Sequence, residues 1–369
     1  MEIALRLAGR MLGRVAPNPA VGCVLVKDGV VIARGSTAPG GRPHAETLAL
    51  QRAGEAARGA TAHVTLEPCA HHGRTPPCAD ALAAAGVARV VVAMTDPDPR
   101  TAGRGIARLR EAGIAVDVGL LADEARALNR GFVLKVTQNR PLVAVKLATS
   151  LDGRIAAAGG DARWITGEAA RRHAHLLRAR HDAILIGGRT ARIDDPELTC
   201  RLPGLEQASP VRVVLTRRRA LEAGSRLAAG AHRVPVWLLL PEGAGAPGLP
   251  APYPDEPGRP GLHAVTFASP PDADAAETAR AILAALAGAG ITRLLVEGGG
   301  EVAGLFVKAG LFDRLYHFTG NCVIGADGVP ALPALGLAAM ADAPRLRLVE
   351  TRALEETVLS VYEPEAATA

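Results

Sequence analysis

Aromatic side chains are scarce in this sequence. Only 3% of the 369 residues are Phe, Trp or Tyr. Proteins that bind single-stranded nucleic acids stack bases on such side chains and follow the backbone with a positive groove. The net charge is only +5, from 42 basic against 37 acidic residues. This composition argues against a nucleic-acid groove and is compatible with binding small phosphorylated molecules.

Long apolar runs and a regular set of cysteines are also lacking. No stretch is long enough to span a bilayer, and residues 1–10 mix apolar and charged side chains, unlike a signal peptide. The cysteine count is five, an odd number, and Cys23, Cys200 and Cys322 are scattered. We therefore expect reduced thiols, no membrane association and a cytoplasmic protein.

Aliphatic residues are abundant, and they fall in a pattern typical of α/β proteins. The chain is 49% hydrophobic and long enough for two domains. Buried strands alternate with amphipathic helices along both halves, which predicts layered α/β domains. The polar stretch 137–141 ends in proline. We expect the domain boundary there, with domains at 1–141 and 142–369.

The strongest chemical motif combines His44-Ala45-Glu46 with Pro68-Cys69 and Pro77-Cys78. One imidazole and two thiolates leave one coordination position open on zinc, which is typical of a catalytic rather than a structural site. Bound zinc lowers the pKa of a water molecule so that it attacks at neutral pH. H-x-E followed by P-C and a second Cys is also the signature of zinc deaminases, in which the Glu is general acid and base. We therefore predict zinc on His44, Cys69 and Cys78, with Glu46 as proton carrier.

Local sequence predicts where these groups lie. His44 and Glu46 fall in the first turn of a helix that continues through 47–57, where the helix dipole favours negative charge. Cys69 follows a strand at 62–66 and lies at its carboxyl edge. Cys78 falls in the first turn of a helix through 80–85, where a thiolate is favoured. The first domain is therefore expected to be a three-layer α/β/α sheet.

Eight residues separate the two cysteines, where usual zinc deaminases have two. This loop contains His71, His72 and Arg74, and its basic character favours an anionic substrate such as a phosphorylated ribosyl compound. As an alternative, the two histidines are extra metal ligands. Asn18, between two prolines before the first strand, is either a turn residue or a contact to the substrate's ring edge.

The second half contains a strand, a glycine run and a helix over 294–305. Glycines let the backbone approach an anion, and the helix start supplies N–H donors, so this pattern predicts a phosphate cradle. A tight structural turn is the alternative. Gly187-Gly188 closes another apolar strand in the same way. Arg217 is placed to grip a nucleotide phosphate, although the run 217–219 is also explained as a solvated corner.

Together these stretches resemble the bifunctional riboflavin-biosynthesis proteins, in which a pyrimidine deaminase is fused to a phosphoribosylaminouracil reductase. The matching segments are Pro17-Asn18-Pro19-Ala20-Val21-Gly22, His44-Ala45-Glu46, 65–78, 146–154, Trp164-Ile165-Thr166, Asp194-Asp195-Pro196 and Glu297-Gly298-Gly299. The resemblance implies a cytidine-deaminase-like domain followed by a dihydrofolate-reductase-like α/β domain with a mostly parallel sheet. It also implies zinc-dependent removal of the 2-amino group of 2,5-diamino-6-(5-phosphoribosylamino)pyrimidin-4(3H)-one. The second reaction is NADPH reduction of the ribosyl group of 5-amino-6-(5-phosphoribosylamino)uracil to ribityl.

The resemblance also assigns binding residues in this sequence. NADPH is expected at Ala148, Trp164, Thr190, Asp194, Arg217, Gly299, Gly300, Glu301, Val302, Ala303, Gly304 and Leu305. The substrate is expected at Asn18 in the first domain and at Ala162, Arg178, Leu198, Arg201 and Glu297 in the second. Arg178 and Arg201 suit a phosphate clamp, with a helix-surface role as the alternative for Arg178. Lys146 and Asp194 are candidates for proton delivery.

Several alternatives stay open at this point. Trp164 is also explained as a core residue and Asp195-Pro196 as a turn. Arg217 stands where the family commonly has a smaller polar residue, and the Pro- and Gly-rich stretch 241–262 carries no motif and suggests an irregular loop. Rival functions are a nucleic-acid editing deaminase and a deaminase with a non-catalytic second domain. The resemblance also implies a homo-oligomer.

Overall fold

The structure is a computed structural model of the 369-residue chain. It describes residues 1–71, 76–217, 221–222, 224–244, 249–268, 270 and 272–365. The chain divides into two compact units, Met1–Asn139 and Arg140–Ala369. No helix in the described ranges is long and apolar enough to cross a membrane.

The first unit is built on a five-stranded sheet in the order β2-β1-β3-β4-β5. The first two strands form an antiparallel hairpin, and β1 is also antiparallel to β3, whereas β3, β4 and β5 run parallel. Asp28 and Gly29 form the hairpin turn with φ values of 50° and 76°, which explains the Asp-Gly pair at this position. The strands are β1 (Gly22–Lys27), β2 (Val30–Ser36), β3 (Thr61–Val64), β4 (Arg89–Val92) and β5 (Ala115–Val118).

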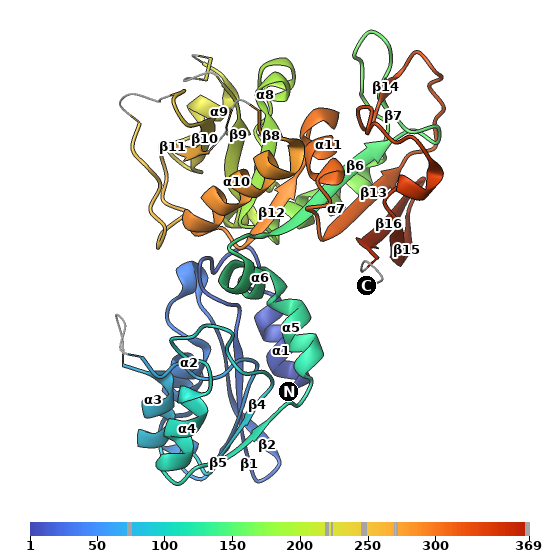
Figure 1. The fold of residues 1–369 in the computed structure, drawn as a ribbon. Coiled ribbons are helices and arrows are strands. Elements are labelled where there is room, and N and C mark those ends of the chain that lie inside the picture. The colour runs from blue at the N-terminus through green and yellow to red at the C-terminus, as the bar shows by residue number, and fades with distance from the viewer. Residues whose placement is uncertain are drawn as a thin grey trace. The chain divides into compact units, whose positions relative to one another are not determined.

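Helices cover both faces of this sheet. Figure 1 shows α2, α3 and α4 on one face and α1 and α5 on the other, which confirms the predicted three layers. The core between them contains Leu25, Val64, Leu82, Val92 and Leu109. The helices are α1 (Glu2–Gly9), α2 (Ala45–Ala53), α3 (Cys78–Ala84), α4 (Arg104–Glu111), α5 (Ala122–Leu128) and α6 (Arg130–Gln138), with 3-10 turns η1 (Pro39–Gly41) and η2 (Gly54–Ala57).

One helix prediction in this unit was wrong in extent. The helix expected over 47–57 ends at Ala53, because Gly54 leaves helical geometry with φ 54°. Further along the chain, helices α5 and α6 meet at Asn129. The carboxamide of Asn129 accepts a hydrogen bond from the backbone N–H of Ala20 and donates one to the carbonyl of Ala20. Long-range bonding of this kind has no local sequence signal.

The second unit is built on a nine-stranded sheet in the order β11-β10-β9-β8-β12-β6-β13-β16-β15. The strands from β11 to β13 run parallel, and β16 and β15 continue the sheet antiparallel, so the predicted mostly parallel sheet is confirmed. The strands are β6 (Leu142–Thr149), β8 (Ala183–Gly187), β9 (Val211–Leu215), β10 (Val236–Pro241), β11 (Leu262–Phe267), β12 (Arg293–Val296), β13 (Arg314–Thr319), β15 (Leu346–Leu354) and β16 (Thr357–Pro364), and a small separate pair is β7 (Arg154–Ala156) with β14 (Val329–Pro330).

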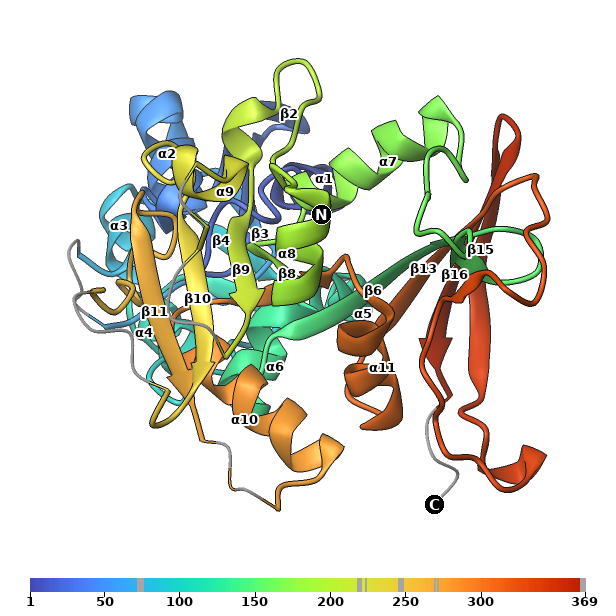
Figure 2. The ribbon, with the colours of Figure 1, turned by 90° about the horizontal axis from the view of Figure 1, so that it is seen from above.

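Helices pack on both faces of the large sheet, with α10 and α11 on one face and α7 on the other (Figure 2). Asp274 caps α10: its carboxylate accepts a hydrogen bond from the N–H of Glu277, and the Glu277 carboxylate accepts one from the N–H of Asp274. The helices are α7 (Glu168–Ala179), α8 (Gly188–Asp194), α9 (Arg226–Ala229), α10 (Ala275–Gly288) and α11 (Gly300–Lys308), with 3-10 turns η3 (Glu206–Ala208) and η4 (Met340–Asp342).

Candidate active sites

Three donor atoms converge in the first unit. The Nδ1 atom of His44 lies 3.3 Å from Sγ of Cys78 and 3.7 Å from Sγ of Cys69, and the three atoms lie within 4.8 Å of one another. Ligand atoms around a tetrahedral zinc ion lie about 3.5 to 3.8 Å apart, given Zn–N and Zn–S distances of about 2.0 and 2.3 Å. The spacing and the chemistry of this donor set therefore fit zinc.

Three separate elements deliver these donors. His44 is the N-cap residue of α2, Cys78 is the first residue of α3, and Cys69 lies in the segment after β3. The backbone N–H of Cys78 donates to the Cys69 sulfur over 3.3 Å. Hydrogen bonds from Cys78 and His44 lower the pKa of the Cys69 thiol to about 4, against the effect of burial. A lowered pKa favours the thiolate form, which is the form that binds metals.

Glu46 lies in the first turn of α2, two residues after His44, and is only 3% exposed. Burial raises the pKa of its carboxyl group above the usual range, although the charge of His44 works in the opposite direction. A carboxyl group that is easily protonated beside a metal site suits a group that accepts a proton and then returns it.

Asn18 and His71 lie near the segments that form this site. A Cβ atom on Gly41 would lie 1.9 Å from Nδ2 of Asn18, so the Asn18 amide packs on the turn that leads to His44. Gly41 also has φ 83°, so its own backbone favours glycine. Among the residues that the structure describes, His71 does not join the three metal donors. The predicted roles of His72 and Arg74 concern residues outside the described ranges.

A buried ion cluster forms in the second unit at the carboxyl end of β12, beside the middle of β6. Glu297 directly follows β12, and its carboxylate accepts two hydrogen bonds of 2.8 Å from the guanidinium of Arg178 on α7. Nζ of Lys146 on β6 lies 3.5 Å from the same carboxylate. The three side chains are 8 to 18% exposed. The helix-surface alternative for Arg178 is therefore wrong.

The carboxyl ends of β8 and β12 lie side by side next to this cluster, because the two strands are parallel neighbours in the sheet. A Cβ atom on Gly299 would lie 3.0 Å from Oγ1 of Thr190, and one on Gly187 would lie 3.2 Å from the Val302 side chain. Gly299 also has φ 72° and is the N-cap residue of α11. The glycines thus let the two strand ends pack closely against Thr190 and Val302. The order of strand, glycine turn and helix start fits the phosphates of a nucleotide cofactor.

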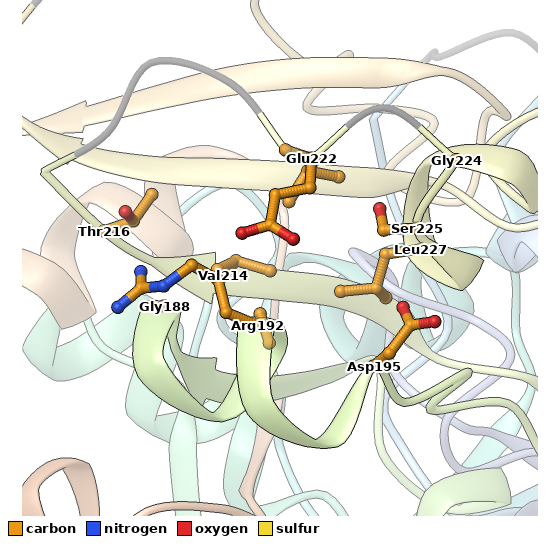
Figure 3. A pocket seen from close by; sticks show the side chains of 11 residues that line it. Gly188, Arg192, Asp195, Val214, Thr216, Glu222, Gly224, Ser225 and Leu227 are labelled. Carbon is orange, nitrogen blue, oxygen red and sulfur yellow. The ribbon is translucent and has the colours of Figure 1, made fainter.

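A pocket of about 290 Å³ opens beside the start of α8 (Figure 3). Gly188 and Arg192 line it from α8, and Thr216 follows β9. Glu222 precedes α9, and Leu227 lies on that helix. Figure 3 shows the guanidinium of Arg192 on the same side of the pocket as Thr216. The lining combines one guanidinium, the two carboxylates of Asp195 and Glu222, two hydroxyl groups and apolar walls. Such a mixture of apolar walls and a few polar groups is typical of small-molecule sites.

Both halves of the chain match known families. Residues 1–94 match the cytidine and deoxycytidylate deaminase zinc-binding region, and residues 141–248 and 255–360 match the RibD C-terminal domain. The riboflavin biosynthesis protein RibD of Escherichia coli K12 is 40% identical over 365 residues, which is 95% of each chain. The RibD of Bacillus amyloliquefaciens is 40% identical over 356 residues, 95% of this chain and 91% of that one.

The chain belongs to the RibD family. A solved structure of Acinetobacter baumannii RibD is 36% identical and superposes with a TM-score of 0.83, covering 99% of this chain and 98% of that one. A diaminohydroxyphosphoribosylaminopyrimidine deaminase/5-amino-6-(5-phosphoribosylamino)uracil reductase of Thermotoga maritima is 35% identical, with a TM-score of 0.82 and coverage of 99% and 97%. As a RibD, the chain is a bifunctional enzyme of riboflavin biosynthesis, with a zinc-dependent deaminase and an NADPH-dependent reductase.

The other predicted residues of this RibD lie in the second unit, mostly near its surface. Trp164 is 70% exposed and stacks on the Arg171 guanidinium at 4.4 Å, so the core alternative is wrong. Leu198 is buried with φ 56°, and Arg201 is exposed and pairs with Glu197 over 3.2 Å. Ala148 lies on β6, Ala162 and Arg217 are exposed, and Asp194 ends α8. Residues 218–219 of the arginine run lie outside the described ranges.

Sequence reasoning missed one group beside the metal site. Glu67 is 3% exposed and accepts four backbone hydrogen bonds, from Asp96, Gly103, Gly105 and Ile106. The only available signal was its position directly before Pro68-Cys69.

Proposed function

We propose that residues 1–141 of this RibD hydrolyse the 2-amino group of 2,5-diamino-6-(5-phosphoribosylamino)pyrimidin-4(3H)-one. We propose further that residues 142–369 reduce the ribosyl group of 5-amino-6-(5-phosphoribosylamino)uracil to ribityl. The observation that carries the proposal is the set of His44, Cys69 and Cys78 donors beside a buried Glu46, in a chain similar along its length to a deaminase/reductase. Neither rival function explains a match that covers both halves.

In the deaminase site, His44, Cys69 and Cys78 hold zinc, which when bound supplies Lewis acidity for the attack of water on the ring carbon. Glu46 accepts a proton from that water and passes it to the departing amino group. The bond between ring carbon and nitrogen then breaks, and ammonia leaves. Asn18 contacts the edge of the pyrimidine ring, because its amide packs on the turn that leads to His44.

In the reductase site, the bound NADPH supplies the hydride, and the protein supplies position and charge. Thr190 and Gly299, at the ends of two neighbouring strands, would hold its phosphates, and the pocket beside Arg192 would take the adenosine end. We propose that the cofactor contacts Ala148, Trp164, Thr190, Asp194, Arg217, Gly299, Gly300, Glu301, Val302, Ala303, Gly304 and Leu305.

The substrate side of this site is assigned to Ala162, Arg178, Leu198, Arg201 and Glu297. Glu297 accepts hydrogen bonds from the ribose hydroxyl groups, and Arg178 holds that carboxylate in place, since two of its nitrogens already bond Glu297. The exposed guanidinium of Arg201 is then the group for the substrate phosphate. Lys146 delivers the proton to the opened sugar, with Asp194 as the alternative donor.

The test is a coupled assay on purified full-length protein. The diaminopyrimidine phosphoribosyl substrate is supplied with NADPH, and ammonia release and loss of NADPH absorbance are followed together. We expect both signals, with ammonia first. Ammonia release without NADPH oxidation, even from the deaminated intermediate, would show that the second unit does other work. Release of ammonia from single-stranded DNA or tRNA instead would favour an editing deaminase.

We also propose that the protein is a homo-oligomer in the cytoplasm. Its five free cysteines, two of them proposed zinc ligands, require a reducing compartment. The strand β15 ends the large sheet and exposes Leu348 and Val349 by 52% and 43%, which suits pairing with a second copy. Light scattering should give a multiple of the 38.0 kDa chain mass. Leu348→Glu should reduce that multiple.

A further inference from the structure

Helix α4 is held at its N-terminus by a residue from outside the helix. Gly103, at its N-cap, has φ 82° and no side chain to accept a hydrogen bond. The carboxylate of Glu67 takes that place. It accepts from the N–H groups of Gly103 at 2.9 Å, Gly105 at 2.9 Å and Ile106 at 3.2 Å, and from Asp96 at 3.1 Å.

These bonds fix the chain directly before a proposed zinc ligand. Each oxygen of Glu67 accepts two of the four hydrogen bonds, and the positive end of the helix favours its charge. The backbone N–H of Glu67 also donates to the carbonyl of Met94 over 3.0 Å. Pro68 and Cys69 are the next two residues in the chain. The backbone that leads to the Cys69 sulfur therefore has little freedom to move.

Two more contacts connect α4 with the cysteine segments. A Cβ atom on Gly105 would lie 1.9 Å from the carbonyl oxygen of Pro68, so the helix backbone packs directly on the Pro68 peptide. Arg108 donates from Nη1 to the carbonyl of Ala70 over 3.2 Å and forms an ion pair with Asp80 of α3. The first residue of α3 is Cys78. One helix therefore contacts the chain before and after Cys69 and the helix that carries Cys78.

We propose that α4 positions the two thiolate ligands, with Glu67, Gly105 and Arg108 as positioning residues of the deaminase site. This inference rests on the proposed zinc site. Glu67 itself binds no metal or substrate, because its oxygens are occupied by backbone donors. Groups that orient metal ligands typically change metal affinity by about 10- to 100-fold when they are replaced.

The experiment compares four variants of the full-length protein: Glu67→Gln, Gly105→Ala, Arg108→Gln and the control Leu109→Ala. Leu109 is a fully buried residue of the same helix, and its apolar side chain forms no hydrogen bond or ion pair with the cysteine segments. Zinc affinity is measured by competition with a chelator, ligand geometry by the electronic spectrum of the Co²⁺-loaded protein, and stability by thermal unfolding.

We expect Glu67→Gln and Gly105→Ala to weaken zinc binding at least tenfold and to change the cobalt spectrum. A Gln side chain presents an NH₂ group to two of the four N–H donors, and the Ala methyl group displaces the Pro68 peptide. The exposed Arg108→Gln variant should weaken zinc binding by about two- to fivefold without loss of fold. Leu109→Ala should unfold at lower temperature with unchanged zinc affinity and spectrum.

The inference is overturned if the folded variants keep zinc affinity within twofold and the wild-type cobalt spectrum, whatever their unfolding temperatures. If Glu67→Gln and Gly105→Ala do not fold, the Arg108→Gln result decides by the same criterion. If the wild type itself binds no zinc, the proposed deaminase site fails first. That result is distinct, because the inference alone fails only when the wild type binds zinc and every folded variant binds it equally well.

Discussion

Arg178 and Glu297 form a two-point ion pair although 119 residues separate them in the chain. Nε of Arg178 donates to one carboxylate oxygen and Nη2 to the other, each over 2.8 Å, and the side chains are 13% and 8% exposed. Nη1 of Arg178 donates to the carbonyl of Thr199 over 3.0 Å. The pair thus joins α7, the end of β12 and the segment after α8 in the proposed substrate site.

Replacing Glu297 with Gln should destabilise the second unit by about 3 to 5 kcal/mol, because Arg178 and Lys146 would stay buried without their carboxylate. Urea unfolding followed by tryptophan fluorescence measures this directly, since Trp164 and Trp237 are the only tryptophans and both lie in the second unit. The control is Arg201→Gln, which breaks an exposed pair and should cost at most about 1 kcal/mol. Equal effects of the two substitutions would contradict the account.

The same carboxylate should make the second unit sensitive to acid. Burial opposes its ionisation, but the charges of Arg178 and Lys146 outweigh that effect and lower the pKa of Glu297 to about 2. A lowered pKa stabilises the fold above the unfolded value of about 4.5, and this stability is lost as the pH falls towards 2. The loss is about 3 kcal/mol at 1.36 kcal/mol per pKa unit. Urea midpoints at several pH values should show it in the wild type and not in Glu297→Gln.

Asp96 should have the opposite effect in the first unit. The pKa of its carboxyl group is raised to about 6, mainly by burial and also by the nearby carboxylates of Asp98 and Glu67. A hydrogen bond from the Asp98 N–H and the charge of Arg100 act in the opposite direction. A raised carboxyl pKa favours the folded state at low pH, and this contribution disappears as the pH rises through 6. Asp96→Asn should therefore stabilise the unit by about 1 to 3 kcal/mol at pH 7.5, and by little at pH 4.

Hydrogen exchange of the β3 and β4 backbone amides measures the difference in stability between the wild type and Asp96→Asn, both loaded with zinc. The matched control is Asp117→Asn, an exposed carboxylate on the neighbouring strand β5, 54% exposed and paired with Arg89. The control should show no such pH-dependent gain. If Asp96→Asn protects the amides equally at both pH values, Asp96 does not titrate as stated here.

The sequence was most informative where chemistry depends on near neighbours. His44 and Glu46 are separated by one residue and Cys78 follows a proline, so helix-start patterns placed these three correctly. The end of the preceding strand placed Cys69. The glycine run before α11 was similarly readable from its strand and helix neighbours. These features need only local turns and caps, which sequence spacing reports directly.

Contacts between distant segments were beyond sequence reasoning. The clamp of Arg178 on Glu297, the capping of α4 by Glu67 and the break at Asn129 each join residues tens of positions apart. The antiparallel strands β15 and β16 were also missed. Because β15 is exposed along most of its length, it lacks the alternation of apolar and polar residues that marks a half-buried strand.

The most direct test of two separate sites is Glu46→Gln assayed for both reactions, with the exposed Glu55→Gln as control. Ammonia release from the diaminopyrimidine substrate should fall by about 10²- to 10⁴-fold, because the proton carrier is lost. NADPH oxidation with the deaminated intermediate should equal that of the wild type, and Glu55→Gln should keep both activities. Undiminished ammonia release by Glu46→Gln, or equal loss of both reactions, would contradict the account.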